Sequence, residues 1–423
     1  MAADGLRNGL SVPAGAALYV GAVLGPGLLL LPGLAVATAG PASVLAWAGL
    51  LVLSAPLTAT FAALGTKHPV AGGTAAYVAV AFGPRWAAAT GWCFVAGVMV
   101  GAPTVSLIGG QYVAVLLGGG RPVALLAAAL MFAAVLGLNA AGLRTSTRAQ
   151  LVAVAVLSVL VLLAVTTALP HARPGAWAPF APHGWLAVGS AANLLALSFV
   201  GWEAVTHLVG DFPDPARQLP RAMAAALALI TVLYLGLAVT TVVALDPRNT
   251  SLVPLADLMQ VGLGRAGRQG TAGLAVLLTL GTTNAYIAGA ATLSTALSRD
   301  GAAPSWIAAG QAHGPPRRGL LLIAAVGTGA LLALALDLTS VEGLIRSAST
   351  LFVAVYAAGT AAGMRLLTGL ARVAAVLAFG LVLLILSFSG RYLLIVVVVS
   401  VAATVYLGHR RSRTRPVVGR RGS

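Results

Sequence analysis

The sequence predicts an all-α integral membrane protein with about twelve transmembrane helices, because it holds about that many apolar runs of spanning length. Hydrophobic residues make up 59% of the 423 positions and charged residues only 8%, and the mean hydropathy is +0.97. A typical soluble domain carries about 25% charged residues. We therefore expect a chain that crosses the membrane many times and exposes little of itself to water.

The expected spans follow the apolar runs in order. They cover residues 11–39, 41–65, 86–117, 122–142, 149–169, 187–211, 221–245, 270–298, 319–337, 342–364, 371–388 and 391–408. A short helix is expected at 74–82, and another, interfacial, in the loop at 246–269. The chain then divides into an N-terminal segment (1–10), a first unit of five spans (11–169), a second unit (187–364), two further spans (371–408) and a basic tail (409–423).

The first span is interrupted in its middle by Gly25-Pro26-Gly27. Proline removes a backbone donor and glycine adds backbone freedom, so the helix should open there. Open backbone at membrane depth is tolerated only where it faces protein or a water-filled cavity, and the helix ends at such a break attract ligands. The alternative is a simple proline kink.

The sixth span carries a similar interruption, and this second break favours a binding site over a simple proline kink. Residues 193–208 read NLLALSFVGWEAVTHL, with Ser198 and Gly201 near mid-span. If spans one to five and six to ten are two units, the breaks fall at corresponding positions. Because five is an odd number, the second unit must insert in inverted orientation. Paired interruptions in an inverted repeat indicate a secondary transporter.

The net charge of +16 does not indicate nucleic-acid binding, because most basic residues fall in loops on one side of the predicted spans. The positive-inside rule places that side, and both termini, in the cytoplasm. The basic tail is either solvated or in contact with anionic lipid. Lys67 is the only lysine among many arginines, which is typical of high-GC coding and indicates the inner membrane of a bacterium. Cys93 is the single cysteine, which excludes an internal disulfide.

Glu203 is the one acidic residue well inside a span, and His207 follows one helical turn later. A carboxyl group inside a membrane is costly and by default marks a functional position. Together the two side chains could couple transport to protons. The alternative is structural, with a protonated Glu203 bonded to the backbone that Gly201 opens.

The eighth span carries a polar cluster of Thr279, Thr282, Thr283, Asn284 and Tyr286. Such groups either bond their own or a neighbouring helix or line a cavity beside the breaks. A sodium site is disfavoured, because no acidic residue lies near the first break. The chain has no phosphate loop, metal-ligand cluster or Ser–His–Asp arrangement, so we expect no ATP, no cofactor and no enzymatic activity. A channel is disfavoured because the polar groups gather at mid-depth.

Ordered motifs over nearly the whole chain resemble the amino acid–polyamine–organocation transporter superfamily. Its first-span motif is similar to the stretch from Gly21 to Pro32, although serine often stands where Pro26 is. Further matches are Pro69-Val70-Ala71-Gly72-Gly73, Phe199-Val200-Gly201-Trp202-Glu203, Pro220-Arg221-Ala222 and Arg299-Asp300-Gly301. Glu203-Ala204 followed by His207-Leu208, with Asn284 and Tyr286, most resembles the bacterial exporters of methionine and branched-chain amino acids.

The resemblance implies a core of ten helices in an inverted repeat, with broken helices one and six, plus two C-terminal helices. It implies that Gly25, Pro26 and Gly27 meet the substrate carboxylate, and that the break at Phe199, Val200 and Gly201 meets the amino group. The side chain would be surrounded by Phe94, Val95, Met99 and Tyr286, with Asn284 in the same substrate-binding set. No acidic residue accompanies them, which favours neutral, hydrophobic amino acids.

We therefore expect a secondary active transporter that exports neutral, hydrophobic L-amino acids by proton antiport and alternating access. Some proton-coupled members of the superfamily carry a lysine in the fifth span; none is present here, so coupling would use Glu203, His207 or another route. An uptake permease or exchanger of the same fold is the alternative. The expected partners are the amino acid, protons and the lipid bilayer, with the oligomeric state left open.

Overall fold

The computed structural model describes residues 10–68, 73–143, 147–204, 212–246, 251–308 and 315–413. Across these residues the regular secondary structure is helical. Ten of the described helices are long and apolar enough to cross a membrane, and shorter apolar helices lie at Val12–Val23, Gly73–Phe82 and Leu186–Phe199. The predicted all-α membrane fold is confirmed.

The first half of the chain contains the first five predicted spans, of which the first is broken. Its elements are, in order, α1 (Val12–Val23), η1 (Pro26–Leu29), α2 (Leu31–Ala39), η2 (Gly40–Ala42), α3 (Ser43–Lys67), α4 (Gly73–Phe82), α5 (Pro84–Leu117), α6 (Arg121–Ala140), α7 (Thr147–Ala168) and η3 (Leu169–His171). α4 is the short helix predicted between the second and third spans.

The second half contains the remaining spans, beginning with the second broken one. Its elements are α8 (Leu186–Leu195), η4 (Ala196–Phe199), η5 (Trp202–Ala204), α10 (Pro215–Ala244), α11 (Pro254–Arg299), η7 (Ser305–Ile307), α12 (Arg317–Ala335), α13 (Val341–Leu366), α14 (Gly369–Ser387), η8 (Gly390–Tyr392) and α15 (Leu393–Arg413).

α11 is much longer than the predicted eighth span because it takes in the helix expected in the preceding loop. Gly264, with a φ of +68°, bends the chain between the two parts. Glycine adopts this left-handed conformation without the clash that a Cβ atom would cause. The predicted interfacial helix and the eighth span are therefore joined through one glycine.

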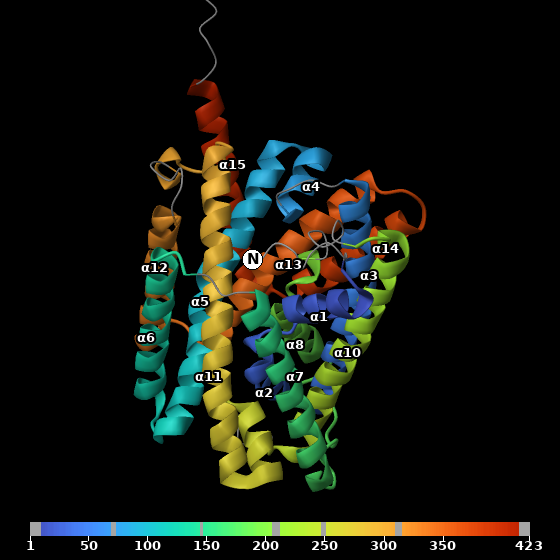
Figure 1. Cartoon of the computed structure of the whole chain (residues 1–423), viewed down its shortest axis with the longest axis vertical. Coiled ribbons are helices and arrows are strands. Elements are labelled where there is room, and N and C mark those ends of the chain that lie inside the picture. Colours follow the sequence, from blue (N-terminus) through green and yellow to red (C-terminus); the bar gives the residue numbers. More distant parts are fainter. Residues whose placement is uncertain are drawn as a thin grey trace, which may run out of the picture.

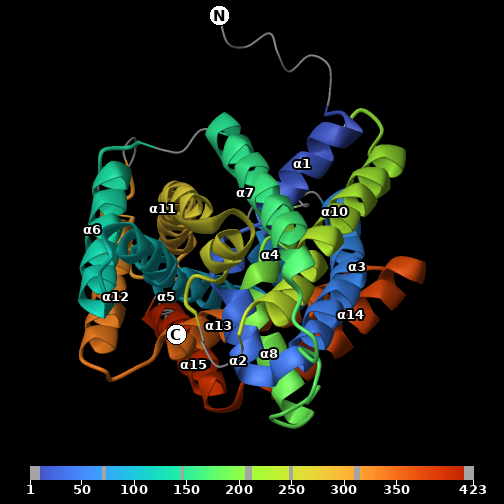
Figure 2. The same cartoon turned by 90° about the horizontal axis from the view of Figure 1, so that it is seen from below.

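The helices run mostly along the long axis of the molecule, whereas α1 lies across its middle (Figure 1). Seen from below, α1 points outward between α7 and α10 (Figure 2), and it packs against both. α5 and α11 pack against each other near the centre, with α6 and α12 to one side and α3, α10 and α14 to the other. The break between α1 and α2 thus lies inside the bundle, where its open backbone can face protein.

Candidate functional site

The first span opens at the Gly-Pro-Gly motif, as the sequence predicts. α1 ends at Val23, and Gly25 is extended, with φ −106° and ψ 177°. The chain then makes the short turn η1 before α2 begins at Leu31. This is a true interruption rather than a proline kink, because extended backbone at Gly25 and the short turn η1 separate α1 from α2.

The second break lies in the predicted sixth span. α8 ends at Leu195 and passes into η4, after which Val200 is extended with a ψ of 132°. Gly201 follows with a φ of +131°, and η5 continues to Ala204. His207 lies outside the described residues, so the structure does not place this predicted coupling residue.

The two breaks cross and touch each other at glycines. A Cβ atom added to Gly201 would stand 2.1 Å from the carbonyl oxygen of Ala22, and one added to Gly27 would stand 2.4 Å from the Ser198 hydroxyl oxygen. Both distances are far below van der Waals contact. Only glycine lets the backbones of the two broken spans approach this closely.

Tyrosine hydroxyls from the surrounding helices bond backbone carbonyls at the two breaks. Tyr234 of α10 donates to the Ser198 carbonyl oxygen at 2.7 Å and also lies 3.1 Å from that of Val23, so it bridges the two breaks. Tyr112 of α5 donates to the Leu29 carbonyl oxygen at 2.7 Å. Unpaired backbone groups inside a membrane would each cost several kcal/mol, so these phenols stabilise the open conformation.

Tyr356 of α13 serves the second break in the same way and reaches the Glu203 carboxylate. Its hydroxyl accepts from the Gly201 N–H at 2.8 Å and lies 2.6 Å from Glu203 Oε2 and 3.2 Å from the Phe199 carbonyl oxygen. The Gly201 N–H also donates to Glu203 Oε2, at 3.1 Å. Glu203, Tyr356 and the Gly201 amide thus form one hydrogen-bonded group at the break.

These three tyrosines bond the backbone of the breaks, and the sequence interpretation missed them. Tyr112, Tyr234 and Tyr356 are each buried, with 6% exposure or less. A buried phenol almost always finds a hydrogen-bond partner. A lone tyrosine inside an apolar span was therefore the available signal, but it does not reveal which carbonyl the hydroxyl reaches.

A cavity of about 530 Å³ lies beside the two breaks, between α1, α7 and α11. We call it the break cavity. Its wall is mostly apolar, and none of the described residues that line it is charged. The lining residues that belong to the breaks or carry polar groups are Gly25, Pro26, Gly201, Gln150, Thr282 and Tyr286.

A second cavity, of about 550 Å³, lies between α4, α5, α11 and α13. We call it the carboxylate cavity, because Glu203 is part of its wall. Thr74, Thr90 and Thr292 add hydroxyl groups to the same wall. Gly201 lines the first cavity and Glu203 the second, so the second break contributes a residue to each wall.

The structure brings together some of the predicted site residues and separates others. Phe94 lines the carboxylate cavity, whereas Met99 lines an apolar groove against α12 and α15. Val95 is fully buried. Phe199 packs on Tyr234, with ring centroids 5.0 Å apart, and Val200 is buried beside it.

The polar cluster of the eighth span mostly bonds within the helices. The hydroxyls of Thr279, Thr282 and Thr283 each donate to a carbonyl oxygen four residues earlier in α11. Asn284 accepts a hydrogen bond from Asn139 of α6 and does not line the break cavity. Of this cluster, Thr282 and Tyr286 are the members on its wall.

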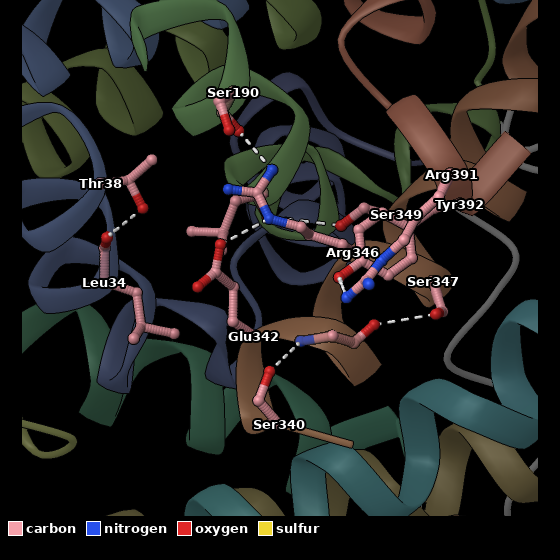
Figure 3. A network of polar contacts seen from close by, with 12 residues as sticks. Leu34, Thr38, Ser190, Ser340, Glu342, Arg346, Ser347, Ser349, Arg391 and Tyr392 are labelled. Carbon is pink, nitrogen blue, oxygen red and sulfur yellow. Dashed lines mark hydrogen bonds and ion pairs between the residues drawn. The ribbon is translucent and has the colours of Figure 1, made fainter. Parts of the chain in front are cut away.

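α13 follows α8 towards the second break with a series of polar side chains. Arg346, 6% exposed, donates to the Ser190 carbonyl oxygen at 2.9 Å and to Glu342 at 2.7 Å (Figure 3). Ser349 donates to the Leu194 carbonyl oxygen at 3.3 Å. Glu342 and Arg346, one helical turn apart in α13, form an ion pair, and the buried arginine also binds α13 to α8.

Comparison with known proteins gives consistent matches. The profile of a family described as amino acid permease matches residues 10–413. The uncharacterized amino acid permease YecA of Bacillus subtilis is 33% identical over 382 residues, which are 88% of this chain and 90% of that protein. The L-methionine/branched-chain amino acid exporter YjeH of Escherichia coli is 31% identical over 261 residues, 61% of this chain and 62% of the exporter. The branched-chain amino acid permease BcaP of B. subtilis is 28% identical over 297 residues, 63% and 62% of the two chains.

Proposed function

Because this chain belongs to the amino acid permease family, we propose that it transports neutral, hydrophobic L-amino acids of the methionine, leucine, isoleucine and valine class. It is a multi-pass membrane transporter and not an enzyme. The name of YjeH refers to methionine and branched-chain amino acids and that of BcaP to branched-chain amino acids, and both support this substrate class.

The break cavity is the observation that carries the proposal. Its volume of about 530 Å³ lies in the range of about 300–1,000 Å³ that small-molecule sites occupy. The N-terminal end of a broken helix attracts a carboxylate and the C-terminal end attracts an ammonium group. With no charged residue among the described lining, a neutral side chain suits this wall better than a cationic one.

Each end of the substrate has a proposed partner. The backbone at Gly25, Pro26 and Gly27 binds the carboxylate, and the carbonyls at Phe199, Val200 and Gly201 bind the amino group. Tyr286 and the apolar residues of α7 and α11 surround the side chain. Phe94, Val95, Met99 and Asn284 contact the substrate only if α5 and α11 rearrange during the transport cycle.

Export by proton antiport is the first choice of direction, and uptake or exchange by the same machinery is the second. The exporter YjeH supports the former. In either case the protein alternates between two states, and differential binding of substrate and proton biases the equilibrium. Glu203 carries the proton, and His207 assists it.

The proposed topology places both termini in the cytoplasm and relates residues 11–169 to 187–364 by inverted repeat. With that orientation, the break cavity reaches the cytoplasmic end of α7, where Ala149 and Gln150 line it. At the opposite end Arg346 binds α13 to α8. We therefore assign the structure to an inward-facing state.

The test is counterflow in proteoliposomes loaded with unlabelled leucine or methionine, with labelled leucine outside. Because counterflow needs only exchange, it detects a carrier whatever its direction or coupling ion. We expect rapid uptake of label with leucine or methionine inside and none with arginine inside. Folded protein that shows no counterflow with any neutral amino acid would refute the substrate class.

A further inference from the structure

Glu203 lines a different cavity from the one that forms the proposed substrate site. Its side chain is part of the wall of the carboxylate cavity and not of the break cavity. The two cavities share no described lining residue. A carboxyl group in this position can exchange a proton without passing through the space that the amino acid occupies.

The carboxylate cavity has the polar groups that hold water. The Thr74 hydroxyl, on a side chain only 6% exposed, has no hydrogen-bond partner among the described residues. Thr90 and Thr292 donate to backbone carbonyls of their own helices, which leaves their oxygens as acceptors towards the cavity. Buried waters occupy sites that are roomy and offer two to four polar partners, whereas purely apolar cavities stay dry.

We propose that the carboxylate cavity is a water-filled proton pathway to Glu203, separate from the amino-acid site. This inference rests on the proposed transport function and adds the route by which its coupling ion enters. Hydronium entering through the cavity gives its proton to the Glu203 carboxylate and leaves water. The reverse transfer restores the carboxylate in the next half of the cycle.

Gly201 connects the two cavities. Its N–H donates to Glu203 Oε2 and to the Tyr356 hydroxyl, while its backbone lines the break cavity and packs on Ala22. Protonation removes the negative charge that strengthens these bonds, so it weakens the hold on the Gly201 amide. The proton therefore acts on the substrate site through the backbone of the second break, which gives the reciprocal coupling that transport requires.

The titratable groups around Glu203 leave it as the proton carrier of this pathway. Tyr356 of α13 bonds it, and Tyr286 of α11 interacts with it electrostatically. The other elements packed on this turn, α1, α3 and α4, contain Tyr19, Lys67 and Tyr77 as their described titratable residues. Among these described residues Glu203 is the one that carries a carboxyl group.

Two glycines of α11 provide a matched pair for the test. Gly289 lines the carboxylate cavity and Gly281 the break cavity. A Cβ atom added to either meets nothing within 4 Å, so a larger side chain enters the cavity rather than the protein. Gly289→Leu obstructs the proposed proton pathway, and Gly281→Leu obstructs the amino-acid site.

The experiment measures two quantities in proteoliposomes for wild type, both glycine variants, Thr74→Val and Glu203→Gln. These are leucine counterflow at equal pH on both sides, and leucine-driven proton movement reported by an internal pH dye. In Gly289→Leu we expect proton movement to fall about tenfold, or about 1.4 kcal/mol in activation free energy, with counterflow retained. Gly281→Leu should lose both, and Thr74→Val should slow proton movement alone.

The outcomes separate the two proposals. Proton movement at the wild-type rate in both Gly289→Leu and Thr74→Val would refute the separate pathway while leaving the transport function intact. Coupled proton movement that persists in Glu203→Gln would refute Glu203 as the carrier and the pathway with it. Wild-type protein without counterflow would instead refute the transport function itself.

Discussion

Gly201 shows how much of this site depends on one residue without a side chain. Its φ of +131° is a conformation that residues with a Cβ atom rarely adopt. Its neighbour across the crossing is not a movable side chain but the Ala22 carbonyl, 2.1 Å from where a Cβ atom would stand. The positive φ and the close Ala22 carbonyl both oppose a side chain at position 201, so their energetic costs add.

We expect Gly201→Ala to destabilise the protein by more than about 3 kcal/mol, since backbone strain alone costs about 1–3 kcal/mol and the clash adds to it. The measurement is the melting temperature in detergent. Gly281→Ala is the control, because it lies within a helix and a Cβ atom there meets nothing within 4 Å. It should change stability little or raise it by about 0.4–1 kcal/mol. Equal melting temperatures for the two variants would contradict the crossing.

Tyr286 is the one aromatic side chain among the described lining of the break cavity, and its hydroxyl would lie 3.7 Å from a Cβ atom on Gly25. Tyr286→Ala enlarges the site next to the first break. We expect the preference for phenylalanine over valine to rise at least about tenfold, because a change of even one methylene in an apolar pocket is worth that much. Competition with labelled leucine measures the preference. An unchanged order of competitors would remove Tyr286 from the binding site.

At the scale of the elements, α13 acts as the support of the second broken span. Arg346, Ser349 and Tyr356 bond successive parts of the chain from α8 to the break. Because α8 ends in open backbone, its orientation depends on bonds to the intact neighbouring helix α13. The spacing of Glu342 and Arg346 reveals the ion pair in the sequence, but not the bond to Ser190.

Replacing Arg346 by methionine keeps much of the buried volume and removes this support. We expect stability to fall by about 1.5–3 kcal/mol, the value of a hydrogen bond that involves a charged group. Glu342 remains partly exposed, at 46%, so no buried charge is left unpaired. Melting temperature in detergent is again the readout.

Arg391→Met is the matched control, because Arg391 is near the same network (Figure 3) but its guanidinium contacts only the neighbouring Tyr392 among the described residues. It should leave the melting temperature unchanged. If both arginine variants melt at the wild-type temperature, α13 does not support α8 through Arg346.

For the molecule as a whole, the sequence predicts what depends on neighbours in the chain. Apolar runs locate the spans, and Gly25-Pro26-Gly27 and Gly201 locate the breaks. The sequence does not predict contacts between residues that are far apart in the chain. Tyr112 lies 83 residues from Leu29, and Tyr356 lies 155 residues from Gly201. Phe94 and Met99 were expected at one site, yet five helical positions turn side chains about 140° apart, and they line different spaces.

The orientation of the whole chain is open to a direct test, because Cys93 is the single cysteine. In a Cys93→Ala background, a membrane-impermeant maleimide should label Ala172→Cys, in the exposed loop after η3, in intact cells. Ser423→Cys should be labelled only after the cells are opened, because the positive-inside rule places the C-terminus in the cytoplasm. The reverse pattern would invert the topology and make the structure outward-facing.

The contact between the two breaks also has an evolutionary consequence. Since a Cβ atom on Gly27 would lie against the Ser198 hydroxyl, a larger side chain at position 27 needs a smaller one at position 198. Positions 27 and 198 should therefore covary among homologous chains, and a side chain gained at one should accompany a loss at the other. Such pairs would trace the transport site through sequences whose substrates have diverged, because the crossing constrains the backbone rather than the ligand.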